Sequence, residues 1–175
     1  VTGSVNAANA TLKAGTDITV NEITAAQKAD FEAGQDFIHN GGAINASEAV
    51  VLAQRNVLLN SGSMVASDNA KLTATNGAIS EKVDYVVDTP DLTASAGTTI
   101  ELGSKVNQLV NVDVTKAGGN VTIGSGYSKN NDALTVATAD VVRGNLVITN
   151  YASENDEQEN TIVVADRLQA TGDII

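Results

Sequence analysis

The stretch "TLKAGTDITVN" at residues 11–21 is followed by a second stretch of the same pattern, "DFEAGQDFIHN" at residues 30–40. Leu12 aligns with Phe31, Asp17 with Asp36 and Val20 with His39, so the two stretches lie 31 − 12 = 19 residues apart. Further copies follow at intervals of about twenty residues: "VVLAQRNVLLN" (50–60), "KLTATNGAIS" (71–80) and "DLTASAGTTIEL" (91–102). A fixed period of this length indicates a stacked repeat architecture.

Each copy consists of short runs in which apolar residues alternate with Thr, Asn, Lys and Asp, and Gly or Asn separates the runs. Alternation with period two predicts strands, and such short strands bury a core only by stacking on their copies. The sequence therefore predicts an all-β fold, a right-handed parallel β-helix with turns of about 20 residues. "NEITAAQKADFEA" (21–33) could form a helix by propensity, but its overlap with the repeat favours strand and corner.

No linker divides the chain, so we expect residues 1–175 to form a single β-helix segment of eight or nine turns. The first residue is a valine, and the segment is expected to be a fragment of a longer repetitive protein. Two loop excursions are predicted. One lies near residues 80–91, which contain the single proline, Pro90, and the other near residues 150–161, which are too acidic for a strand.

Composition excludes several classes of function. The formal net charge of −11 disfavours nucleic acid as a partner, and aromatic residues make up only 3% of the chain. The absence of cysteine excludes disulfides, a thiolate nucleophile and cysteine-ligated metals. No apolar run is long enough to cross a membrane, so membrane insertion is not expected.

His39 is the single histidine of the chain. Near Asp36 and Glu32 it could act as a general base or a metal ligand, but no second histidine or nucleophile accompanies it. The repeat gives it a structural interpretation instead, because Val20 and Leu59 occupy the same place in the flanking copies. That alignment predicts a buried, hydrogen-bonded ring, whereas a register shift by one residue would turn it to solvent.

Candidate ligand residues are few. Asp84, Asp88 and Asp91 cluster near Tyr85 and are candidates for a calcium site, but their spacing matches no calcium-binding loop and a solvated loop is the preferred interpretation. No catalytic residue and no cofactor is predicted. Asn21, Asn40 and Asn60 recur one turn apart, which predicts a ladder of stacked asparagine side chains.

The repeats "LKAGTDITV", "LTATNGAIS", "LTASAGTTIEL" and "VTKAGGNVTI" resemble those of the filamentous haemagglutinin family, large bacterial exoproteins exported by two-partner secretion. The resemblance covers most of the chain and is weakest at residues 80–91 and 127–160. It implies a right-handed parallel β-helix, a secreted or cell-surface location, and a role in adhesion or biofilm cohesion. It implies no catalytic residues, so the chain is not expected to be an enzyme.

The functional expectation is a structural and binding segment of a secreted bacterial surface adhesin. Its expected partners are a glycan or protein receptor on host or bacterial surfaces and an outer-membrane secretion partner, with end-to-end self-association as a further possibility. Two alternatives use the same fold. One is a self-assembling extracellular filament subunit, and the other, less favoured, is a polysaccharide lyase or hydrolase with acids on consecutive turns.

Overall fold

The computed structural model describes residues 4–126, 133–151 and 161–175, which form thirteen strands of one sheet and no helix. The strands are β1 (Ser4–Ala14), β2 (Ile18–Val20), β3 (Glu22–Ala33), β4 (Phe37–Ala53), β5 (Val57–Ala74), β6 (Ile79–Glu81), β7 (Val86–Ala96), β8 (Ile100–Leu102), β9 (Gln108–Ala117), β10 (Val121–Ser125), β11 (Leu134–Val141), β12 (Leu146–Asn150) and β13 (Ile162–Ala170). All described pairings are parallel. The fold is therefore the predicted parallel β-helix, and β3 replaces the helical alternative.

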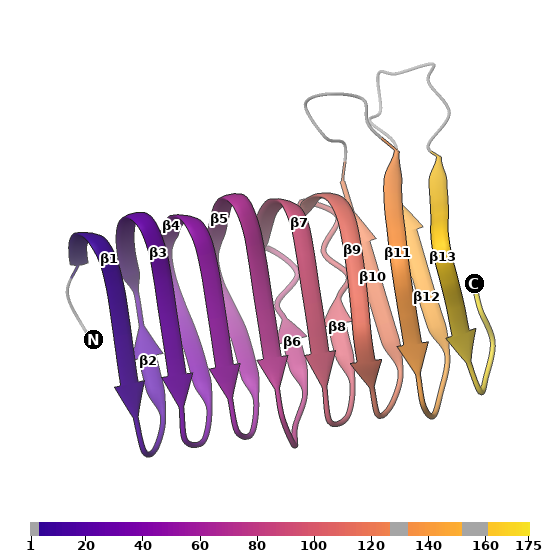
Figure 1. The fold of residues 1–175 in the computed structure, drawn as a ribbon, viewed down its shortest axis with the longest axis horizontal. Coiled ribbons are helices and arrows are strands. Elements are labelled where there is room, and N and C mark those ends of the chain that lie inside the picture. Colours follow the sequence, from indigo (N-terminus) through magenta and orange to yellow (C-terminus); the bar gives the residue numbers. More distant parts are fainter. Residues whose placement is uncertain (1–3, 127–132, 152–160) are drawn as a thin grey trace.

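Figure 1 shows how the chain coils. The long strands, among them β1, β7, β9, β11 and β13, run downward on the near side, while the short strands β2, β6, β8, β10 and β12 run upward behind them. Each circuit also advances from left to right (Figure 1). Descent in front, ascent behind and advance to the right together make the coil right-handed, as predicted.

The turns lengthen along the coil. Corner residues that bond to one another on successive turns are 19, 20 and 22 residues apart in the first half of the coil and 25 and 28 apart in the second. The coil consequently has about seven turns of about 21 residues, fewer than the eight or nine expected. The longer turns of the second half account for the lower number.

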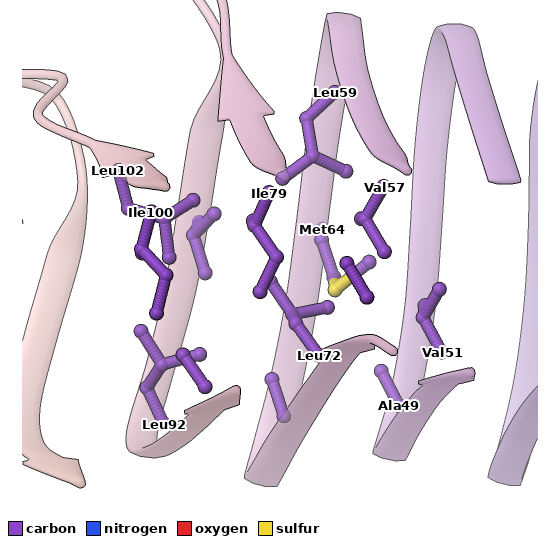
Figure 2. Packing of buried hydrophobic residues seen from close by; sticks show 14 of the residues in the cluster. Ala49, Val51, Val57, Leu59, Met64, Leu72, Ile79, Leu92, Ile100 and Leu102 are labelled. Atoms are coloured by element: carbon purple, nitrogen blue, oxygen red, sulfur yellow. The ribbon is translucent and has the colours of Figure 1, made fainter. Parts of the chain in front are cut away.

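The core consists of columns of apolar side chains, mostly aliphatic, with one residue from each turn. One column runs through Ile18, Phe37, Val57, Ile79 and Ile100 and continues to Val121 and Leu146, all of them buried. Figure 2 shows Val57, Ile79 and Ile100 following one another inside the coil, with Met64, Leu72 and Leu92 filling the space beside them. Parallel pairing in register places equivalent residues one strand spacing, about 4.8 Å, apart, so the sequence period becomes a continuous apolar interior.

The first expected excursion is wrong for most of its length. Within residues 80–91, β6 ends at Glu81 and β7 begins at Val86, so only a tight turn of four residues leaves the ladder. Pro90 lies inside β7, where the pairing with β9 passes from Thr89–Leu109 to Asp91–Asn111 and leaves the proline out. A proline is tolerated there because its missing N–H is not needed. Residues 152–160 of the second excursion lie outside the described residues.

Candidate functional site

Polar side chains interrupt the apolar interior at one corner of the coil. In the column that begins with Val20, the partners in register are His39, Leu59 and then Glu81. His39 is fully buried, at 0% exposure. The interpretation of His39 as an inward-facing residue is therefore confirmed, and the alternative register that would expose it is wrong.

Both ring nitrogens of His39 are occupied. Nε2 lies 2.9 Å from the backbone carbonyl oxygen of Asn21, and Nδ1 lies 2.6 Å from the hydroxyl of Tyr85. A carbonyl oxygen can only accept, so Nε2 carries the proton and donates it, which leaves Nδ1 of the neutral ring to accept from Tyr85. Burial lowers the pKa of His39 and keeps the ring neutral. A histidine so engaged has no nitrogen left for a substrate or a metal ion.

Tyr85 reaches His39 across the intervening turn of Leu59, from 46 residues further along the chain. Its ring is fully buried and stands edge-on to the imidazole, with 5.4 Å between the ring centroids. The tight turn between β6 and β7 positions it, because the Tyr85 amide donates to the Lys82 carbonyl over 2.9 Å. Burial, and then the nearby Glu81, raise the pKa of Tyr85, so the hydroxyl stays protonated and able to donate.

Glu81 places a carboxyl group in a column that is otherwise mostly aliphatic. Its Oε2 atom accepts from the Ser104 amide and from Nδ2 of Asn107, each over 3.0 Å. Its Oε1 atom is buried and has no hydrogen-bond partner among the described residues. Burial raises the pKa of Glu81 to about 7, and the two donated hydrogen bonds only partly oppose that rise.

Asn107 joins this corner to the neighbouring turns. Its Oδ1 atom accepts from the Val87 amide over 2.8 Å, and its Nδ2 group also approaches the Leu102 and Gly124 carbonyls at 3.4 and 3.3 Å. The hydroxyl of Ser104 donates to the Val83 carbonyl over 2.8 Å. We call His39, Glu81, Tyr85, Ser104 and Asn107 the polar cluster. Its members bond mainly to one another and to backbone groups, so the cluster joins neighbouring turns of the coil.

A second set of polar residues forms a ladder at the corner that directly precedes β2, β4, β5, β10 and β12. Oδ1 of Asp17 accepts from the Asp36 amide, Oδ1 of Asp36 from the Asn56 amide, and Oδ1 of Asn56 from the Ala78 amide, at 2.9–3.0 Å. Asn120, Asn145 and Asp173 repeat the arrangement further along. Arg55 forms two hydrogen bonds with the Asp36 carboxylate, and these lower the pKa of Asp36.

The asparagine ladder predicted for Asn21, Asn40 and Asn60 is confirmed only between Asn40 and Asn60. Nδ2 of Asn60 donates to Oδ1 of Asn40 over 2.8 Å. Asn21 contributes its backbone carbonyl to His39 instead. The more extensive ladder at the neighbouring corner was missed, although Asp or Asn directly precedes the apolar run in most of the repeats, as at Asp17, Asp36 and Asn56.

The structure does not gather the three aspartate candidates into one group of possible metal ligands. Asp84 is exposed in the tight turn, Asp88 lies in β7 opposite Gln108 of β9, and Asp91 accepts a hydrogen bond of 2.7 Å from Asn111. Across residues 4–126, 133–151 and 161–175, no group of three or more His, Cys, Asp or Glu side chains is arranged to hold a metal ion. The preferred interpretation of a solvated loop holds for Asp84 alone, since Asp88 and Asp91 belong to a strand.

Glu81 and Asn107 were not predicted as site residues. The signal for Glu81 was present, because the repeat aligns it with Leu59 and a charged residue replaces an aliphatic one. Asn107 lies outside the aligned repeats, so no sequence feature marked it. Its side chain reaches Glu81, 26 residues away in the sequence, only because the coil places the two residues side by side.

Comparisons with protein-family models, with curated proteins and with solved structures find no match to this chain. In the part of the chain that the structure describes, no helix has the length and apolar character needed to cross a membrane.

Proposed function

We propose that this chain is a structural and binding segment of a secreted bacterial surface adhesin, mediating cell adhesion or biofilm cohesion. The observation that carries the proposal is the parallel ladder, which repeats through about seven turns with one apolar interior. A coil of this kind lengthens by whole turns, about 4.8 Å each, and each turn contacts only its neighbours. It can therefore hold binding surfaces at a distance from a cell.

The chemistry of the described residues supports a mechanical role over a catalytic one. His39 is fully buried with both ring nitrogens bonded, so it offers no general base to a substrate. The surface carries exposed ion pairs between turns, such as Lys13 with Glu32, and a net charge of −11, which keeps a long rod solvated. The resemblance of the repeats to filamentous haemagglutinins supports a secreted or cell-surface location and an outer-membrane secretion partner.

The experiment tests adhesion and catalysis together. Beads coated with the folded chain are expected to attach to bacterial or epithelial cell layers, or to hold cells together in a biofilm, more than beads coated with another protein of similar negative charge. The same preparation is incubated with a panel of acidic polysaccharides. Attachment no better than the control would contradict the adhesin proposal, and cleavage of a polysaccharide would favour the lyase or hydrolase.

One observation favours the filament subunit as a second candidate. The turn containing β13 presents Ile162, Val163 and Val164 with 40–47% of each residue exposed. Further turns stacked on β13 would cover these residues, whether they came from the same chain or from another copy. Sedimentation velocity over a wide concentration range distinguishes the candidates, because only the filament subunit forms open-ended polymers of growing size.

A further inference from the structure

The coil has an unpaired strand edge at each end. β1 lies at one end and β13 at the other (Figure 1). Among the described residues, β1 pairs only with β3 and β13 only with β11. An unpaired edge presents a row of backbone N–H and C=O groups, which is a template for another strand. A further turn can therefore be added at either end.

The β13 end exposes apolar side chains that are oriented for an interior. Ile162 and Val164 pair in register with Leu134 and Val136, which are both buried. They consequently face inward, yet they are 40% and 47% exposed. Ile174, at the corner that follows, is 50% exposed. These side chains become core residues only when another turn covers them.

The first turn of the same chain matches this end. The stretch "LQATGDI" (168–174) repeats "LKAGTDI" (12–18), and the same interval of 168 − 12 = 156 residues separates every equivalent pair. The corner between the two strands of a turn therefore has the same length at both ends, so a single placement brings strand and corner into register together. At both ends the Leu and the first Ala of this stretch are only partly buried, whereas their equivalents in the intervening turns are fully buried.

The ladder of corner residues supplies a hydrogen bond for this contact. Within the coil, Oδ1 of Asp17 accepts from the backbone amide of Asp36 on the next turn. At the far end the Asp173 amide donates to Asn145, but Oδ1 of Asp173 accepts from no described residue. The Asp17 amide likewise has no acceptor among the described residues. Stacking the first turn of one copy on the last turn of another would join this donor to this acceptor.

We propose that the turn containing β13 binds a second copy of this chain, with β1 of that copy lying parallel to β13 and Leu12 opposite Leu168. The opposed residues are then Thr11 and Arg167, Leu12 and Leu168, Lys13 and Gln169, and Ala14 and Ala170. No like charges face each other across these two strands, as stable strand pairing requires. Asp17 on Asp173 repeats the contact that Asp36 and Asp17 form within the chain.

The contact is head-to-tail, so every added copy presents the same end again and the polymer stays open. Each copy advances the polymer by about seven turns of about 4.8 Å, roughly 34 Å. The inference deepens the second candidate function, the filament subunit, and rests on it, because it names the partner and the register. It is independent of adhesion.

Cysteine cross-linking tests the register, because the chain contains no cysteine of its own. Lys13→Cys labelled with ¹⁵N is mixed with unlabelled Gln169→Cys and oxidised in a glutathione buffer. About 0.5 M NaCl screens the repulsion between chains of net charge −11. Opposed residues on neighbouring strands lie about 4.8 Å apart, within reach of a disulfide, so mixed dimers should form and be identified by their mass.

The matched control mixes Lys13→Cys with Arg167→Cys. Arg167 lies two residues from Gln169 on the same side of β13, so its Cα atom would be roughly 8 Å from that of residue 13 in the second copy. That distance exceeds the reach of a disulfide, and few mixed dimers should form.

Two lysine variants separate stacking on the interior from general adhesiveness of this end. Val164 and Val163 are 47% and 42% exposed, but Val164 faces the interior and Val163, opposite Thr135, faces outward. In sedimentation velocity, Val163→Lys should form polymers as the parent chain does. Val164→Lys would bury a charge in the contact and should raise the concentration at which polymers appear by at least about tenfold.

The outcomes separate this inference from the functions proposed above. Equal cross-linking of the matched and control pairs, or equal effects of the two lysine variants, would overturn the proposed register. Polymers of the parent chain without the matched cross-link would also overturn it but retain the filament subunit, whereas a parent chain that stays monomeric at every concentration would overturn both. Attachment of coated beads to cells measures adhesion separately, and none of these results bears on it.

Discussion

Replacing Tyr85 by phenylalanine removes one oxygen atom from the polar cluster and leaves the ring in place. The hydroxyl lies 2.6 Å from Nδ1 of His39, and both residues are fully buried. Nδ1 then becomes a buried acceptor without a donor, and no water can reach it without a cavity. Leaving such a group unpaired costs about 1–3 kcal/mol, so Tyr85→Phe should lower the free energy of unfolding by that amount.

The reasoning also predicts how Tyr85→Phe combines with a change of its partner. His39→Leu places a leucine between Val20 and Leu59 of the same column, but it leaves the Tyr85 hydroxyl and the Asn21 carbonyl unpaired. In the double variant the phenylalanine and the leucine meet as apolar groups. The double variant should therefore lose about 1–2 kcal/mol less than the sum of the two single losses.

Urea unfolding followed by far-ultraviolet circular dichroism at pH 7.5 measures all four proteins of this cycle. Tyr151→Phe is the control, since Tyr151 is 36% exposed and lies outside the cluster, and its effect should stay within about 0.5 kcal/mol. A loss below about 0.5 kcal/mol in Tyr85→Phe, or strictly additive losses in the double variant, would show that the hydrogen bond between His39 and Tyr85 does not stabilise the coil.

Three further predictions concern single residues. The pKa of Glu81 is about 7 in the folded chain and near 4.5 in the unfolded chain, so the folded chain retains a proton between these pH values. The free energy of unfolding should therefore fall as the pH rises from 4.5 to 7, by up to (7 − 4.5) × 1.36, roughly 3 kcal/mol. In urea titrations at a series of pH values, Glu81→Gln should remove this pH-dependent component. Ala78 interrupts the Asp and Asn ladder, so Ala78→Asn should add a side-chain acceptor for the next turn and raise the free energy of unfolding by about 0.5–1.5 kcal/mol. Ala78→Leu adds no acceptor and should not raise the free energy of unfolding. Equal effects of the two substitutions would rule out the ladder as the cause. A Cβ on Gly34 would clash with the Gly15 carbonyl oxygen, while one on Gly15 meets nothing within 4 Å. Gly34→Ala should therefore lower the thermal midpoint by several degrees, and Gly15→Ala should leave it nearly unchanged.

The repeat predicted the coil because period and alternation are local properties of the chain. Leu12 and Phe31 align in the sequence and pair in the structure, and the same holds for Val57 beside Phe37. The alignment of the repeats could not predict which side chains fit together inside a corner of the coil. Whether His39 fits inward depends on Tyr85, 46 residues away, and no periodicity connects those two residues.

The error at residues 80–91 has the same origin. A proline and three aspartates suggested a loop, whereas the structure pairs Val86 and Val87 with β5 and leaves Pro90 out of the pairing on both edges of β7. The residue composition of a segment reflects that segment alone, whereas its pairing in a parallel sheet depends on the strands of the turns on both sides. β7 is held between β5 and β9, and the pairing on both edges outweighs one missing donor.

The polar cluster also distinguishes one turn of the coil from another. Columns of Val, Ile and Leu are nearly interchangeable, so a stack of such turns could slip by a whole repeat and still bury its apolar residues. A bond between His39 and Tyr85, two turns apart, and another between Glu81 and Asn107 can form in one alignment only. We infer that the cluster sets the alignment of these turns, at some cost in stability relative to a column made of aliphatic residues alone, and this is the role best attested for buried polar groups. The double variant His39→Leu with Tyr85→Phe tests this directly: its amide spectrum should contain more than one set of signals for the first turns, and a single set matching the parent protein would mean that the aliphatic columns fix the alignment unaided.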